Sequence, residues 1–283
     1  MKVISSPEEI LRITSLSKKE ELDVGLVPTM GALHDGHLTI VKRCIKENNI
    51  SVVSIFVNPL QFNNSEDLEA YPRDEDGDLS KLKSLGVDYV FIPSANLFYK
   101  NKPEIVFSFG ELGQVLEGKY RQGHFEGVGI VVTKLFNLVQ PDRAYFGLKD
   151  LQQFIIIKKL VESLSFPIQI KGVETVRENT GLAMSSRNKR LSKEGLVIAS
   201  NIFKTLKKGE QGIINAEPIE AIMDQMHDSL LSIEGLEIEY LSIADGNSLK
   251  EIKSYEGVNE LAICFAGYVE GVRLIDNLYL RLN

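Results

Sequence analysis

A strand-to-helix junction near residue 30 constrains the fold of this chain more than any other segment. Residues 24–28 have the composition of a buried strand, and His34-Asp35-Gly36-His37 follows where helical periodicity begins. Gly31 and Gly36 let the backbone approach a ligand closely, because they carry no Cβ atom. The free N–H groups and the positive dipole at the start of a helix favour phosphate. The junction therefore predicts a β–α unit with an anion-binding turn.

Short apolar strands alternate with amphipathic helices through the first 175 residues. Strands are expected at residues 2–4, 24–27, 51–57, 88–92, 144–146 and 168–173. Helices are expected from residue 7 and at residues 37–48, 74–85, 127–139 and 151–163. This alternation predicts an α/β fold with a doubly wound, Rossmann-like parallel sheet. Ligands of such sheets bind at the carboxyl ends of the strands.

The pattern changes after residue 175. Helices are expected at residues 192–207 and 218–231, and three successive strands follow at residues 236–243, 260–265 and 273–280. Consecutive strands separated by turn residues are typical of an antiparallel sheet. We therefore expect two domains: residues 1–175, with the doubly wound sheet, and residues 176–283, a smaller α+β domain.

The charge balance argues against a broad surface for nucleic acid. The 283 residues include 32 basic and 39 acidic side chains, which give a net charge of −7 and a pI near 5.3. This balance disfavours nucleic acid and anionic membranes as partners, and no apolar run is long enough to span a membrane. Cys44 and Cys264 lie far apart without metal-ligand spacing, so we interpret both as reduced apolar residues of a cytoplasmic protein.

The two histidines of the junction suggest chemistry on a phosphate. Imidazoles at the start of a helix can donate hydrogen bonds to charge that develops on a phosphate, as nucleotidyl transfer requires. A histidine pair alone is more often a surface feature, or a metal site. The longer run Pro28-Thr29-Met30-Gly31-Ala32-Leu33-His34-Asp35-Gly36-His37-Leu38 resembles the adenylate-forming signature of pantothenate synthetases (pantoate–β-alanine ligases). That family belongs to the His-x-Gly-His nucleotidyltransferase superfamily.

Further motifs between residues 25 and 277 are similar to the same family. They are Phe56-Val57-Asn58-Pro59-Leu60-Gln61-Phe62, Tyr71-Pro72-Arg73, Gly123-His124-Phe125-Glu126-Gly127-Val128, Phe146-Gly147-Leu148-Lys149-Asp150-Leu151-Gln152-Gln153, Gly181-Leu182-Ala183-Met184-Ser185-Ser186-Arg187-Asn188 and Arg273-Leu274-Ile275-Asp276-Asn277. Two segments depart from the family pattern. Gln122 stands where Pro is common, and Asn179-Thr180 where an acidic residue is usual. Both departures concern loop detail and remove no reactive group.

The resemblance implies an ATP-dependent, AMP-forming ligase that condenses pantoate with β-alanine to pantothenate. The intermediate would be pantoyl adenylate, and it should stay noncovalent, since no Ser, Cys or Lys in the motifs has an adjacent base. The resemblance assigns catalysis to His34, His37, Lys149 and Arg187, and substrate binding to Gln61 and Gln153. It assigns ATP binding to Met30, Gly31, Ala32, Leu33, His34, Asp35, Gly36, His37, Gly147, Leu148, Lys149, Asp150, Val176, Met184, Ser185, Ser186 and Arg187.

The resemblance also implies Mg²⁺, a homodimer and a nucleotide- and pantoate-binding first domain. The second domain, which is joined to the first at a loop with expected phosphate ligands, is well placed to act as a lid. Mg²⁺ accompanies ATP and is held largely by phosphates and water. The acidic cluster Asp74, Glu75, Asp76 and Asp78 favours a solvated helix face over a metal ligand.

Two other hypotheses stay open. One is another His-x-Gly-His nucleotidyltransferase, which makes a coenzyme or dinucleotide and would lack the pair Gln61 and Gln153 in these motifs. The other is a non-catalytic nucleotide-binding regulator or dimeric scaffold. Release of pyrophosphate from ATP upon addition of pantoate would exclude the regulator.

Overall fold

Contacts within the chain define two units in the computed structural model, which describes residues 1–63 and 65–282. Unit 1 comprises Met1–Gln114, Gly118–Leu148 and Gln153–Glu174. Unit 2 comprises Val115–Glu117, Lys149–Gln152 and Thr175–Asn283. Two short segments from the first 175 residues therefore group with the C-terminal part of the chain.

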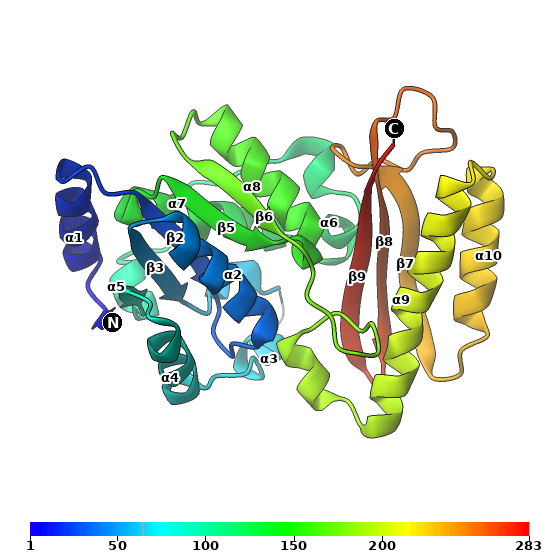
Figure 1. Ribbon diagram of the computed structural model, residues 1–283, viewed down its shortest axis with the longest axis horizontal. Helices are drawn as coiled ribbons and strands as arrows, with labels where there is room; N and C mark the ends of the chain where they lie inside the picture. Colours follow the sequence, from blue (N-terminus) through cyan, green and yellow to red (C-terminus); the bar gives the residue numbers. More distant parts are fainter. Residues whose placement is uncertain (64, 283) are drawn as a thin grey trace. The chain divides into compact units, whose positions relative to one another are not determined.

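Unit 1 contains a six-stranded sheet with the order β1-β4-β3-β2-β5-β6, in which every pair is parallel (Figure 1). Its strands are β1 (Lys2–Ile4), β2 (Val24–Thr29), β3 (Ile50–Ile55), β4 (Tyr89–Phe91), β5 (Arg143–Gly147) and β6 (Gln169–Val173). The chain builds outward from β2 through β3 to β4, and then returns to add β5 and β6 on the other side of β2. Such a reversal opens a crevice for ligands at the carboxyl ends of the two strands that flank it, here β2 and β5.

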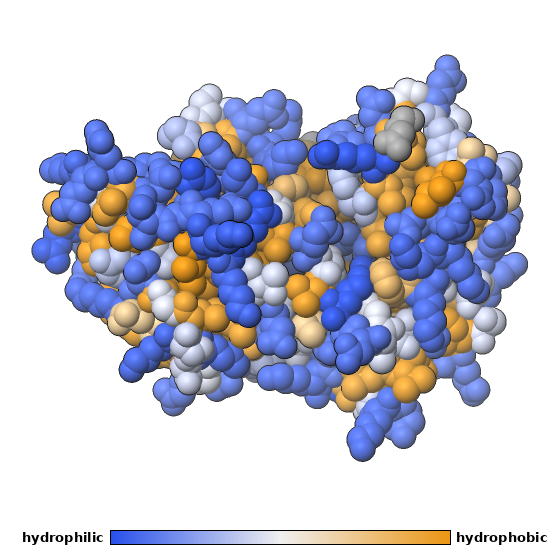
Figure 2. Space-filling view, viewed as in Figure 1, coloured by the Kyte–Doolittle hydropathy of each residue, from blue (hydrophilic) through white to orange (hydrophobic). Residues whose placement is uncertain are grey.

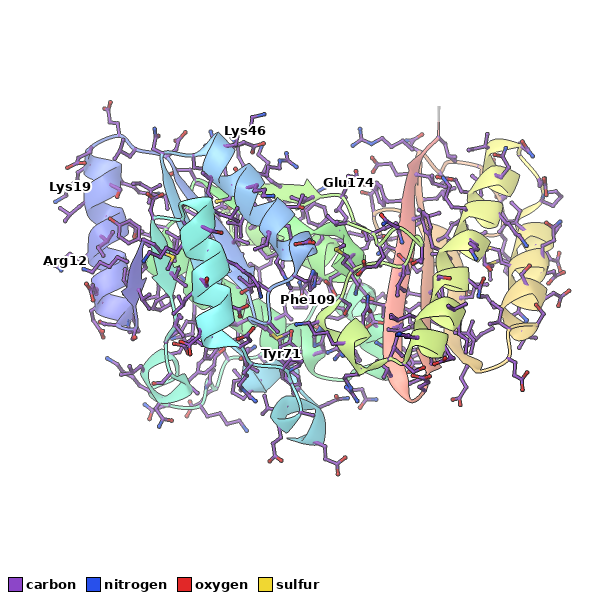
Figure 3. The ribbon with its side chains drawn as sticks, turned by 60° about the horizontal axis from the view of Figure 1, so that its bottom comes forward. Arg12, Lys19, Lys46, Tyr71, Phe109 and Glu174 are labelled. Carbon is purple, nitrogen blue, oxygen red and sulfur yellow. The ribbon has the colours of Figure 1, made fainter. Side chains whose placement is uncertain are left out.

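Helices cover both faces of this sheet. One face packs against α1 (Pro7–Lys19), α7 (His124–Val139) and α8 (Leu151–Ser163), and the other against α2 (Asp35–Glu47) and α4 (Glu75–Leu85). Successive strand residues enter opposite cores, as alternation requires: Leu26 belongs to the first and Val27 to the second. On the outer side of α1, Arg12 and Lys19 point away from the sheet (Figure 3). The predicted doubly wound fold is confirmed.

Several element boundaries differ from the sequence prediction. Helix α2 begins at Asp35 and α7 at His124, whereas the periodicity placed their starts at residues 37 and 127. Strand β3 ends at Ile55 rather than at residue 57. Short helical turns also occur in segments that had no predicted element: η1 (Pro59–Gln61), α3 (Ser65–Glu69), α5 (Ala95–Phe98), η2 (Gly110–Gly113), α6 (Glu117–Tyr120), η3 (Leu148–Asp150) and η4 (Ser186–Arg190).

Unit 2 contains the antiparallel sheet β7-β8-β9, as predicted. Its strands are β7 (Leu236–Asp245), β8 (Glu260–Val269) and β9 (Val272–Arg281), and α9 (Lys193–Ile214) and α10 (Ile219–Leu231) cover one face (Figure 1). The β8–β9 hairpin turns at Glu270 and Gly271, whose φ angles are 51° and 72°. Two successive positive φ angles are typical of the type I′ turn that matches strand twist.

Buried polar contacts join the segment Val115–Glu117 to unit 2. Arg273 of β9 donates to the two carboxylate oxygens of Glu117 at 2.9 and 2.7 Å, and it also binds Glu239. Burial opposes the charge of Arg273, but the hydrogen bonds to both carboxylates raise its pKa. The side chain of Gln152 accepts from Glu117 N at 3.0 Å and donates to Val115 O at 2.9 Å. These contacts explain why two short segments belong to unit 2.

The surface in view is predominantly hydrophilic, with apolar side chains in small separate patches (Figure 2). Large apolar side chains instead gather in the two cores of unit 1 and the single core of unit 2. Within the described part of the chain, no helix combines the length and the apolar character needed to cross a membrane.

Candidate active site

His34 and His37 together cap the start of α2. His34 Nδ1 accepts a hydrogen bond from Gly36 N at 3.2 Å, and His37 Nδ1 accepts one from His34 N at 3.4 Å. The two ring centroids are 4.1 Å apart. Because each Nδ1 accepts a hydrogen bond, each neutral ring carries its proton on Nε2. Two Nε2–H donors are thus held at the positive end of a helix that follows β2 directly.

The turn before His34 is held by α4. Gly31 and Ala32 have φ angles of 82° and 51°, so the chain passes through two left-handed residues in succession. Leu33 follows, and both of its main-chain groups are bound: its N–H donates to Asp78 Oδ1 at 2.7 Å, and its carbonyl accepts from Lys81 Nζ at 2.9 Å. Helix α4 therefore fixes the residue that immediately precedes the histidine cap.

The acidic cluster on α4 divides into exposed and buried members. Asp74 caps the helix by accepting from Gly77 N at 3.1 Å, and Glu75 and Asp76 are exposed. Asp78, in contrast, is only 1% exposed, so the prediction of a solvated face is wrong for this residue. Its Oδ2 is buried and has no hydrogen-bond partner among the described residues. Among all the residues that the structure describes, no group of three or more His, Cys, Asp or Glu side chains could hold a metal.

Gln61 connects the second motif to the junction. Its side chain is buried, with Nε2 donating to Met30 Sδ at 3.1 Å and Oε1 accepting from Asn58 Nδ2 at 3.1 Å. Tyr99 donates its hydroxyl to Asn58 Oδ1 at 2.9 Å, and burial raises the pKa of Tyr99, which keeps this donor protonated. His124 Nδ1 lies 2.9 Å from Gln61 O. Residues 30–37 and Gln61 are thus brought together within unit 1.

The contacts of Gln61 add Asn58 and His124 to the residues that shape the site. Neither was among the predicted site residues, although both lie in motifs quoted above. The signal was available for Asn58, since an amide at the end of a strand stands three residues before Gln61. For His124 the sequence offered only its place in a glycine-rich segment.

Residues 147–153 begin with the last residue of β5, the strand next to β2. Gly147 ends this strand, and a Cβ atom there would lie 3.4 Å from Ile40 Cδ1 of α2, so the strand end and the helix are in contact. Leu148, Lys149 and Asp150 form the turn η3 before α8. Gln153 is half-buried in the first turn of α8 and takes no part in the contacts of Gln61 described above.

In unit 2, Val176 and Met184 face each other across a short hairpin. Met184 N donates to Val176 O at 3.0 Å, and Glu178 N donates to Leu182 O at 2.8 Å. Gly181, with a φ of 91°, makes the turn. The predicted adenine contact and the start of the Met-Ser-Ser-Arg motif are therefore neighbours.

The Met-Ser-Ser-Arg motif leads into η4. Ser185 caps this turn by accepting from Arg187 N at 3.3 Å. Ser185 and Arg187 are half-buried, whereas Ser186 is only 7% exposed. The turn also carries Lys189 and Arg190, so it is locally basic in a chain whose net charge is −7. A basic turn with hydroxyls and a guanidinium suits a polyphosphate.

Comparisons with known proteins identify the family of this chain. A family model described as pantoate-beta-alanine ligase matches residues 2–279. The chain is 44% identical over 282 residues to pantothenate synthetase from Cytophaga hutchinsonii, with 99% of each chain covered. It is 42% identical over 278 residues to pantothenate synthetase from Bacteroides fragilis, with 98% of each covered.

Solved structures extend the similarity to three dimensions. The crystal structure of pantothenate synthetase from Thermus thermophilus has a TM-score of 0.91 and 37% identity, covering 98% of this chain and 99% of that one. Pantoate-beta-alanine ligase from Francisella tularensis, complexed with beta-gamma ATP and beta-alanine, has a TM-score of 0.79 and 33% identity, covering 98% and 97%. These matches confirm the resemblance: the chain belongs to the pantoate-beta-alanine ligase family.

Proposed function

We propose that this protein condenses pantoate with β-alanine in two steps at the expense of ATP. A pantoate carboxylate oxygen attacks the α-phosphorus of ATP, and pyrophosphate leaves. The β-alanine amine then attacks the acyl carbon of pantoyl adenylate, and AMP leaves as pantothenate forms. The observation that carries the proposal is the reciprocal histidine cap at the end of β2, joined through Met30 to the buried amide of Gln61.

In unit 1, the proposed roles follow from the donors that the junction offers. The Nε2–H groups of His37 and His34 stabilise charge on the departing pyrophosphate at the positive end of α2, and residues 30–37 bind ATP. Gln61 and Gln153 bind pantoate, because an amide can donate to a carboxylate and accept from a hydroxyl. Positioning and charge stabilisation can carry such a reaction without covalent participation of the protein.

In unit 2, the proposed roles belong to the basic groups. Lys149, Ser185, Ser186 and Arg187 bind the phosphates, with Arg187 forming the bidentate contact that a guanidinium allows. The main chain of Val176 contacts adenine, and Met184 and Asp150 complete the proposed ATP ligands of this unit. Gly147 and Leu148, which belong to unit 1, are further proposed ATP ligands. We propose that unit 2 acts as the lid of a nucleotide- and pantoate-binding first domain.

The cysteines support a noncovalent intermediate. Burial raises the pKa of both Cys44 and Cys264 to about 12, so both are protonated thiols at neutral pH. A thiol rather than a thiolate is a poor nucleophile and acyl acceptor. Neither residue lies in a motif assigned to a substrate.

Mg²⁺ fits the chemistry of the site as a companion of ATP. It would be held mainly by phosphates and water, which suits a chain whose described residues form no acidic cage. The unpartnered Oδ2 of Asp78 offers a buried carboxylate oxygen beside Gly31, where it would lie 3.2 Å from an added Cβ. Bound Mg²⁺ would offset part of the negative charge of the triphosphate.

The resemblance further supports a homodimer as the working form, and the widely separated cysteines support a location in the cytoplasm. Sedimentation analysis and cell fractionation test these two proposals. The activity itself is tested by mass spectrometry of a reaction containing ATP, pantoate and β-alanine. Pantothenate and AMP should appear in equal amounts, and omission of any substrate should abolish both. Binding of ATP without turnover would favour the regulator, and transfer of AMP to a nucleotide acceptor would favour another His-x-Gly-His enzyme.

A further inference from the structure

The motif Arg273-Leu274-Ile275-Asp276-Asn277 on β9 has no role in the proposed chemistry. Asp276 and Asn277 are nevertheless buried, with 5% and 7% of their surfaces exposed. In the β8–β9 register, Asp276 lies opposite Phe265 and Asn277 opposite Cys264. Because successive strand residues project to opposite faces, the two polar side chains serve different partners.

Asp276 holds the hairpin that carries Val176 and Met184. Its carboxylate accepts from both terminal nitrogens of Arg177, at 2.7 and 2.9 Å. Arg177 also donates to Gly181 O at 3.1 Å, and its guanidinium lies 3.7 Å from the centroid of the Phe203 ring. A bidentate, stacked guanidinium has one defined orientation. The ion pair therefore fixes the hairpin at both its first strand and its turn.

Asn277 holds the main chain of Lys149. Its Nδ2 donates to Lys149 O at 2.7 Å, across 128 positions of sequence. The main chain of Asn277 takes part in the first contact as well, since its carbonyl accepts from Arg177 at 3.2 Å and its N–H donates to Asp276 Oδ1 at 2.8 Å. Two consecutive residues of β9 therefore connect the two segments of unit 2 to which ATP ligands are assigned.

We propose that Asp276 and Asn277 are positioning residues for ATP: Asp276 acts through Arg177 on the adenine-contacting hairpin, and Asn277 acts through Lys149 on the phosphates. This inference rests on the proposed function. Neither side chain needs to touch the nucleotide. Asp276 fixes the guanidinium of Arg177, which is next to Val176, and Asn277 fixes the main chain of Lys149, whose ammonium is proposed to bind phosphate. Displacement of such groups by a fraction of an ångström weakens binding without unfolding the unit.

Two variants of matched size separate the roles. Asn277→Asp replaces the donor to Lys149 O by an acceptor, and Asp276→Asn removes the charge that pairs with Arg177. Isothermal titration should show that Asn277→Asp lowers ATP affinity by about tenfold or more and AMP affinity by less than about threefold. Asp276→Asn should lower the affinities for both ATP and AMP. The hairpin that Arg177 holds contains the proposed adenine contact, and it also leads directly into Ser185. Asp224→Asn, an exposed charge removal on α10, should change neither affinity.

A double-mutant cycle with Lys149→Ala provides a readout that a purely structural role would not move. If Asn277 acts through the Lys149 ammonium, then Asn277→Asp should have little further effect on ATP affinity in the Lys149→Ala background. Asn277→Ala, which removes the donor without adding charge, replaces Asn277→Asp in the cycle if the latter does not fold.

The outcomes distinguish this inference from the proposed function. A wild-type protein that does not bind ATP, or makes no pantothenate, would refute the proposed function. The positioning role alone would be refuted if the wild type is active but Asn277 variants lower the affinities for ATP and AMP equally. It would also be refuted if the effect of the Asn277 variant on ATP affinity adds fully to that of Lys149→Ala. An ATP-selective loss that disappears in the Lys149→Ala background would establish it.

Discussion

Gly127 lies where α7 packs against the turn that carries Gln61. A Cβ atom at Gly127 would lie 2.3 Å from Leu60 O and 2.6 Å from Gln61 N, both of them main-chain atoms. Because the optimal separation between nonbonded heavy atoms is about 3.5 Å, Gly127→Ala must move the helix and the turn apart by about 1 Å. Asn58 also donates to Gly127 O at 3.1 Å, so the same shift disturbs the amide that orients Gln61.

The expected cost is moderate for stability and larger for activity. Overpacking destabilises by about 1–3 kcal/mol, and Ala in a helix returns about 1 kcal/mol relative to Gly. The melting temperature should therefore fall by only a few degrees. A displacement of about 1 Å at a substrate-positioning group can lower turnover about 10²-fold. We expect kcat/KM for pantoate to fall by about 10–100-fold, while KM for ATP changes by less than about threefold.

Gly129→Ala is the matched control, with the same substitution two positions further along α7. Its Cβ would lie 2.9 Å from Phe109 Cζ and 3.0 Å from Phe107 Cδ2, which are side-chain atoms of half-buried rings that can move. Steady-state kinetics with pantoate and ATP varied in turn, together with thermal unfolding, compare the two variants. A folded Gly127→Ala protein with wild-type kinetics for pantoate would refute the assignment of Gln61.

Four further predictions concern other side chains. His37→Ala should lower pyrophosphate release in the first step by about two to four decades, because one donor to developing charge is lost; near-normal release by a folded variant would contradict its role. Arg187→Lys should weaken ATP binding and turnover although it keeps the charge, and wild-type titration curves would exclude a bidentate phosphate contact. Gln153→Ala should raise KM for pantoate far more than KM for ATP, and the opposite pattern in steady-state kinetics would reverse its assignment. With their pKa values raised to about 12 by burial, Cys44 and Cys264 should resist a thiol-specific disulfide reagent at pH 8 and react only in denaturant.

The arrangement of strands follows from local patterns, and so the sequence predicts it well. Alternating apolar strands and amphipathic helices indicated the doubly wound sheet, and consecutive late strands indicated the antiparallel one. The start of α2 was missed because His34 caps it through a ring nitrogen. Helix starts are usually predicted from a Ser, Thr, Asp or Asn residue at the cap position, and histidine is not one of these residues.

Long-range polar contacts explain what could not be predicted. The burial of Asp78 could not be predicted, because the sequence shows only one more acidic residue in a polar helix. Its hydrogen-bond partner, Leu33 N, lies 45 positions away. The grouping of residues 115–117 with unit 2 depends on the pair Glu117 and Arg273, which are 156 positions apart. The motif resemblance supplied the proposed site residues, but it contained no information about which side chains hold them in place.

Isotope exchange between pyrophosphate and ATP tests the central claim most directly. The proposed ATP ligands and the proposed pantoate ligands Gln61 and Gln153 suffice for the first step without the second amine. Labelled pyrophosphate should therefore enter ATP when pantoate is present and β-alanine is absent, and His37→Ala should suppress this exchange. Exchange that occurs only after addition of β-alanine would contradict a free pantoyl adenylate, and no exchange under any condition would contradict adenylation itself.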